Sequence, residues 1–220
     1  MRALSPLEAR VLGVLVEKAH TVPDSYPLSM NALVLGCNQK TARAMPMNAS
    51  DAEVQAATAA LSGLNLVAEV SGSRVTRYQH RMGFGLAVPA QSVALLTVLV
   101  LRGPQTSAEL RTACERLHKF ADLSAVDGFL NELAERSADK GGPLAVLLPR
   151  APGSREGRWA HLLSGPVDLA AWAARVDAGR AAGAADPAIA AVELAELRAE
   201  VDTLRALVER LYDELGVART

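Results

Sequence analysis

Apolar residues recur every three or four positions in two stretches of the chain, the spacing that places them on one face of a helix. Residues 6–20 contain Leu7, Val11 and Leu15, and residues 90–102 contain Val93 and Leu96 in a closely similar order. Two further helices are expected after each, near 29–37 and 51–63 in the first half and near 107–117 and 124–137 in the second. The pattern therefore predicts the same three-helix run twice.

The expected helix starts share a chemical signature. A hydroxyl residue followed three positions later by a carboxylate satisfies free amide donors of the first helical turn in both directions. This spacing occurs at Ser5 with Glu8, Ser50 with Glu53, Thr106 with Glu109 and Ser124 with Asp127. We therefore expect a capping box at each of these four places.

Each third helix leads into sequence typical of a β-hairpin, at 66–70 with 75–78 and at 144–148 with 158–162. The motif Ser-Arg-x-x-Arg-aromatic-x-His ends both hairpins, at 73–80 and again at 154–161. Three helices closed by a two-stranded hairpin form the winged-helix variant of helix-turn-helix. The predicted fold is mainly α with small β-hairpins (α+β), with winged-helix domains at 1–84 and 85–165.

The last part of the chain predicts a linker and a coiled coil. Residues 166–186 are rich in Ala, Gly and Asp, whereas residues 187–220 carry an apolar heptad with Glu and Arg on its flanks. β-Branched residues at a with Leu at d favour a parallel two-stranded coil, so we expect a homodimer. The predicted dimer contacts are Leu194, Leu197, Val201, Leu204, Val208, Leu211 and Leu215. Folding of this helix back onto the winged-helix domains is the alternative.

Composition narrows the class of protein. Residues 1–165 hold 17 Lys+Arg against 14 Asp+Glu, a mildly basic body that permits an anionic partner without requiring one. No stretch is long and apolar enough to span a membrane, and no secretory leader is evident, so a cytoplasmic protein is expected. Nucleophile elbows, phosphate loops and metal-ligand spacings are absent, so we expect no enzyme activity, no cofactor and no metal.

Two pairs of residues occupy equivalent places in the halves. Cys37 and Cys114 are predicted to be buried small apolar residues of the second helices. His80 and His161 stand two positions after Tyr78 and Trp159, and side chains two apart share one face of a strand. We expect each histidine to face the core beside its aromatic neighbour, hydrogen-bonded and structural.

DNA binding is the leading functional hypothesis, because winged helices commonly place the third helix in the major groove and the wing beside the backbone. The candidate contacts are the hairpin arginines Arg74, Arg77, Arg155 and Arg158, then Lys40 and Arg43 before the third helix, with Gln55 and Asn131 facing bases. The hairpin arginines have a structural alternative. Both third helices begin with carboxylates, which repel phosphate, so a protein–protein adaptor is the second hypothesis.

Several longer phrases resemble the YceH family of bacterial proteins. They are 26–34 with 37–43, 72–81, 101–106, 116–122 and the final 161–165, and together they cover nearly all of residues 4–165. The resemblance implies a tandem winged-helix fold and carries no established activity. The chain departs from the family after Arg43, where Ala44 and Met45 stand in place of an acidic residue and proline.

Overall fold

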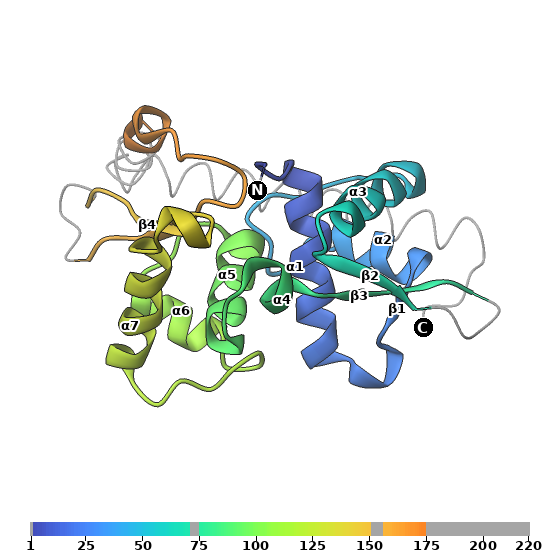
Figure 1. Cartoon of the computed structure of the whole chain (residues 1–220), viewed down its shortest axis with the longest axis horizontal. Coiled ribbons are helices and arrows are strands. Elements are labelled where there is room, and N and C mark those ends of the chain that lie inside the picture. Colours follow the sequence, from blue (N-terminus) through green and yellow to red (C-terminus); the bar gives the residue numbers. More distant parts are fainter. Residues whose placement is uncertain (1, 71–74, 151–155, 175–220) are drawn as a thin grey trace, which may run out of the picture. The chain divides into compact units, whose positions relative to one another are not determined.

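Three helices and a small sheet build the first half of the chain (Figure 1). They are α1 (Pro6–Thr21), α2 (Met30–Asn38) and α3 (Asp51–Gly63), with a 3-10 turn η1 (Pro23–Ser25) before α2. Strands β2 (Val67–Val70) and β3 (Arg77–His80) form an antiparallel hairpin, and β1 (Leu28–Ser29) pairs with the other edge of β3. This computed structural model describes residues 2–70, 75–150 and 156–174.

The second half repeats this order of elements. The short helix α4 (Met82–Leu86) leads to α5 (Ala90–Arg102), α6 (Ser107–Ala113) and α7 (Leu123–Ala134), followed by a 3-10 turn η2 (Ala138–Lys140). Strands β4 (Ala145–Leu147) and β5 (Trp159–His161) form its hairpin, and Gln105 makes an isolated bridge to Trp159 where the first half has β1. The described residues therefore form a mixed α+β fold with two small antiparallel sheets.

Helix starts follow the predicted capping chemistry in three of four places. Ser5, Ser50 and Thr106 each cap a helix reciprocally with the glutamate three positions on. The fourth prediction, Ser124 with Asp127, is wrong. The cap of α7 lies two residues earlier, where the Asp122 side chain accepts the Ala125 N–H at 2.8 Å, so Ser124 already lies in the first turn.

The first helices of the two halves pack against each other at the centre of the unit formed by residues Met1–Leu169 (Figure 1). Their apolar faces are fully enclosed, for example at Leu15 and Leu99. A side chain at Gly13 would place its Cβ 2.9 Å from Leu101, so glycine permits the close approach of α1 to α5. The Leu4 N–H also donates to the Leu163 carbonyl at 2.8 Å. The halves thus share one apolar core.

Elsewhere the sequence predictions differ from the structure in length and position. Helix α6 ends at Ala113 and α7 at Ala134, each a few residues before the predicted end. Helix α4 was not predicted, and it spans the boundary expected between residues 84 and 85. Cys37 and Cys114 are buried as predicted, and burial raises the pKa of each thiol to about 12.

The paired histidines lie beside buried aromatic residues, as predicted. Tyr78 and Trp159 are buried, and His80 and His161 are half-buried on the same strands. Within the described residues, however, the enclosed Nδ1 atom of each histidine has no hydrogen-bond partner, so the expected hydrogen bond is wrong for that atom. Burial lowers the pKa of His161 to about 4. The pKa of His80 is also lowered, first by burial and then by the charge of the nearby His20.

Candidate functional site

The second arginine of each hairpin motif binds its own half. The Arg77 guanidinium donates to the Pro27 carbonyl at 2.8 Å, just before α2. The Arg158 guanidinium donates to the Pro104 carbonyl at 3.0 Å and makes two bonds of 2.7 and 2.8 Å to the Glu109 carboxylate at the start of α6. These arginines therefore hold the strand that ends each hairpin against the segment that opens the second helix.

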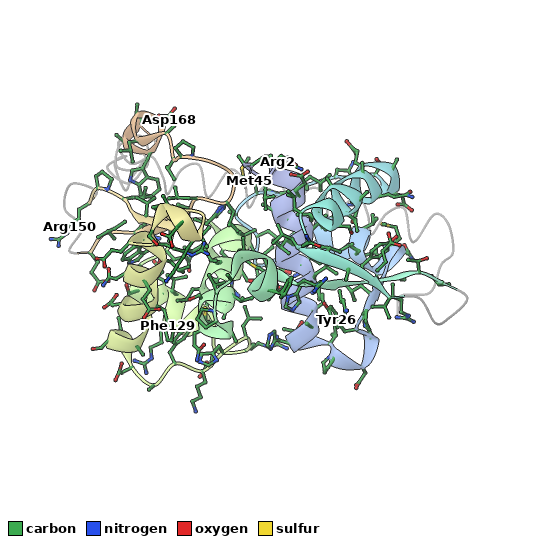
Figure 2. All side chains as sticks on the ribbon, in the orientation of Figure 1. Arg2, Tyr26, Met45, Phe129, Arg150 and Asp168 are labelled. Carbon is green, nitrogen blue, oxygen red and sulfur yellow. The ribbon has the colours of Figure 1, made fainter. Side chains whose placement is uncertain are left out.

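Both arginines keep part of their side chain in solvent. Arg77 is exposed, and the Arg158 side chain is 38% exposed. Arg74 and Arg155, the other two hairpin candidates, lie outside the described residues. Arg150, which follows β4 in the connection to β5, is exposed and points away from the body in Figure 2. The described hairpin cations are thus accessible to a partner, although Arg77 and Arg158 already donate hydrogen bonds within the protein.

Arg43 is not available to a phosphate backbone. Its side chain is 0% exposed, and its two terminal nitrogens bind the Glu17 carboxylate at 3.0 and 2.7 Å. The prediction that Arg43 contacts DNA is therefore wrong. The segment that follows α2 folds back over α1, and the Ala44 N–H donates to the Leu101 carbonyl at 2.8 Å, which encloses the guanidinium.

A second guanidinium is enclosed beside this ion pair. Arg10 is 4% exposed and donates to the Cys37 carbonyl at 3.0 Å and to the Met45 carbonyl at 2.6 Å. Burial, and then the charge of Arg43, lower the pKa of Arg10. Burial raises the pKa of Glu17, but the hydrogen bonds and charges of Arg43 and Lys18 together outweigh it and hold that pKa below its ordinary value.

The buried cluster of Arg10, Glu17 and Arg43 was not predicted from the sequence. A signal for it was present, because Arg10 and Glu17 interrupt an otherwise apolar helix face at positions seven apart. The pattern does not show which segment of the chain covers these two side chains. A buried ion pair needs a specific partner, and that partner comes from 26 residues further along the chain.

Three remaining candidates are accessible. Lys40 is exposed after α2, Gln55 is exposed on α3, and Asn131 is exposed on α7. The side chains around the last two do not suit DNA, because neither α3 nor α7 contains a Lys or Arg. The exposed positions of α3 after Glu53 are Gln55, Ala56, Ala59 and Gly63, and those of α7 include Asn131 and Glu132.

The predicted coiled-coil contacts at 194–215 lie outside the described residues. Within the part of the chain that the structure describes, no group of three or more His, Cys, Asp or Glu side chains could hold a metal ion. None of the described helices combines the length and the apolar character needed to cross a bilayer.

Comparison with known proteins places the chain among bacterial relatives. Residues 4–154 match the family model described as "Protein of unknown function, DUF480". A "UPF0502 protein" of Leptothrix cholodnii is 57% identical over 219 residues, covering 98% of this chain and 97% of the relative. A second, of Burkholderia cenocepacia, is 55% identical and covers 99% of this chain and 91% of the relative. A third, of Verminephrobacter eiseniae, is also 55% identical, with 97% and 88% covered.

Proposed function

The chain belongs to the DUF480 family of proteins, and we propose that it is a protein–protein interaction adaptor built on two tandem winged-helix modules. The repeated order of three helices and an antiparallel hairpin supports the tandem modules. Winged helices serve both nucleic-acid and protein recognition, so the choice rests on the surface that each third helix presents.

That surface is the observation that carries the proposal. Helix α3 begins with Asp51 and Glu53 and then presents an uncharged face of small side chains. Helix α7 exposes Glu132 and, at its start, Leu123, which is 37% exposed. A phosphate backbone is disfavoured by carboxylates and gains nothing from alanine, whereas small side chains let a partner helix approach closely. The partner of this adaptor is therefore expected to dock through an apolar helix.

DNA binding through the hairpins is the second candidate. It is favoured by the exposure of Arg77, Lys40 and Arg150 and by the partial exposure of Arg158. Contacts of this kind would be made to phosphates and would carry little sequence discrimination. Arg43 no longer belongs to this set of contacts.

Changes at position 56 separate the two functions. Ala56 is exposed near the middle of α3, and Ala56→Arg adds a cation there without filling the core. If α3 faces DNA, affinity for a fluorescein-labelled duplex should rise and the salt slope should steepen by about one. If α3 docks a protein, a photo-crosslinker at position 56 should give a discrete product in cells, and an arginine at the adjacent Ala59 should abolish it.

Controls make both outcomes decisive. A crosslinker at Thr112, exposed on α6, should give no such product. For DNA, fluorescence anisotropy with mixed duplex fragments compares the wild type with a variant in which Arg74, Arg77, Arg155 and Arg158 are replaced by alanine. Wild-type binding that survives about 0.15 M salt and falls in this variant would overturn the adaptor in favour of the second candidate.

We also propose that residues 187–220 join two chains through a parallel coiled coil, supported by the heptad of apolar and flanking charged residues. Two chains would present four winged-helix modules and raise avidity for a repeated partner. Leu204→Lys with Leu211→Lys should convert a dimer to a monomer in sedimentation equilibrium. A wild-type monomer at micromolar concentration would exclude this assembly.

A further inference from the structure

A basic cavity lies between the two halves, away from the hairpins and the third helices. Its volume is about 420 Å³, within the range of small-molecule sites. The walls come from the ends of α1, α5 and α6 and from the segment after α2. From its shape and charge we propose that this cavity binds a small organic phosphate, a role separate from the proposed docking of a protein.

Three cations line the cavity, namely Lys18, Arg102 and Arg116. Arg102 and Arg116 are exposed, and among the described residues neither guanidinium has a hydrogen bond or an ion pair. Lys18 lies 3.2 Å from the Glu17 carboxylate and donates to Gln39 at 3.0 Å. Two guanidinium groups without a carboxylate partner beside an ammonium group are suited to a phosphate, which accepts several charge-assisted hydrogen bonds.

The single carboxylate in the wall does not cancel this charge. Both oxygens of Glu17 are bound by Arg43, which is itself fully enclosed. Arg10 is enclosed next to that pair and binds two carbonyl oxygens. The buried cluster behind the cavity therefore holds two guanidinium groups for one carboxylate, and an anion in the cavity would offset the surplus positive charge.

The remaining wall residues indicate what else the ligand carries. Thr21, Thr41 and Gln39 provide polar groups, while Val98, Leu101 and Leu117 form an apolar part of the lining. Basic residues in a last helical turn also offset the helix dipole, but that role needs neither a cavity nor an apolar wall. A phosphate joined to a compact apolar body matches both parts of the lining.

A neighbouring open groove shares Arg102 and Arg116 with the cavity, and two carboxylates, Glu109 and Glu115, also line this groove. Glu109 is occupied by Arg158. The groove is more open than the cavity and carries these carboxylates. An anion is therefore better placed on the side of the two arginines that faces the cavity.

Phenyl phosphate is a suitable probe, because it joins a phosphate to a small apolar ring. Isothermal titration calorimetry on the full chain should show one saturable site per chain, and the melting temperature should rise with probe concentration. Phenol should not bind, and inorganic phosphate should bind more weakly than phenyl phosphate. Arg102→Gln with Arg116→Gln should weaken binding at least about tenfold, the loss expected for one charge-assisted hydrogen bond.

A charge-matched variant guards against general electrostatics. Arg111→Gln with Lys119→Gln removes two exposed cations from the same region, neither of which lines the cavity, and it should leave affinity within about twofold. Three results would overturn the proposal. They are no binding at about 10 mM probe, equal losses in the two double variants, or dependence on Arg102 and Arg116 seen with duplex DNA and absent with phenyl phosphate.

Discussion

The two halves share an order of elements but hold the connection between their second and third helices by different means. In the first half the segment 39–50 is held by polar contacts, which are those of Arg10, the Arg43–Glu17 ion pair and two hydrogen bonds between Asn38 and Ala49. In the second half the segment 114–122 is held by aromatic packing. Phe120 is 5% exposed and lies 4.8 Å from the His118 ring and 6.2 Å from the Phe129 ring, measured between centroids.

This difference can be followed residue by residue, because α1 and α5 start 84 positions apart and carry matching apolar faces. Arg10 then corresponds to Ala94, and Glu17 corresponds to Leu101. The second half thus has apolar residues where the first half has its buried charges. One scaffold accommodates both solutions because the helices supply the core, while the connection needs only a satisfied contact, with α1 in the first half and with α7 in the second.

The largest expected effect comes from copying one residue of the second half into the first. Glu17→Leu leaves the enclosed guanidinium group of Arg43 without its carboxylate partner and should lower the free energy of unfolding by about 4 kcal/mol. Adding Arg43→Met should recover most of that loss, because the buried charge pair is then replaced by apolar groups. Urea denaturation at neutral pH measures both, and a double variant no better than the single one would contradict this account.

The corresponding change in the second half removes its aromatic contact. Phe120→Ala should lower the free energy of unfolding by about 3 kcal/mol, since a nearly enclosed ring is lost and a cavity remains. Phe120→Leu, which keeps most of the volume, should cost under about 1.5 kcal/mol. If Phe120→Ala were as mild as Phe120→Leu in chemical denaturation, the aromatic cluster would not be what holds this connection.

Acid should lower the stability of both halves through their equivalent histidines, His80 and His161. Above the ordinary pKa of 6.5, His161 is neutral whether folded or unfolded. Below it the unfolded chain binds a proton that the folded chain refuses until the pKa of about 4. His161 should therefore make stability fall by about 1.4 kcal/mol per pH unit from about pH 6 to pH 4.

Replacing each of the two equivalent histidines in turn tests this expectation. His161→Leu should flatten this part of the pH profile of the unfolding free energy, measured by urea titration at each pH. His80→Leu should act in the same direction, because burial also lowers the pKa of His80. A wild-type profile that is level between pH 6 and pH 4 would rule out a buried neutral His161.

The smallest expected effect is at the hairpin arginines. Arg158→Gln should cost about 0.5 kcal/mol, because the Arg158 and Glu109 side chains are 38% and 42% exposed and solvent screens their attraction. Raising the salt concentration should reduce this difference further. A loss above about 2 kcal/mol in thermal unfolding would mean that the pair does more than hold an exposed strand.

Helix positions were predictable because they depend on local chemistry. Ser5, Ser50 and Thr106 each have the matching glutamate three residues on, and these starts marked out α1, α3 and α6. Helix α5 follows Pro89 without such a cap and was marked out by its apolar periodicity alone. Where local chemistry offered two solutions, prediction was wrong. Asp122 and Ser124 are both good caps, and the structure selects the earlier one.

The local sequence pattern could not predict which of the candidate DNA contacts are exposed and which are buried. Lys40 and Arg43 are three residues apart and look alike in sequence, yet one is exposed and the other is enclosed with Glu17. The sequence by itself determined the three main helices and the hairpin of each half, and their repetition, because caps and periodicity act within a few residues; α4 and β1 had no such local signal. Tertiary structure alone decided which charges face solvent, because burial depends on segments that meet from distant parts of the chain.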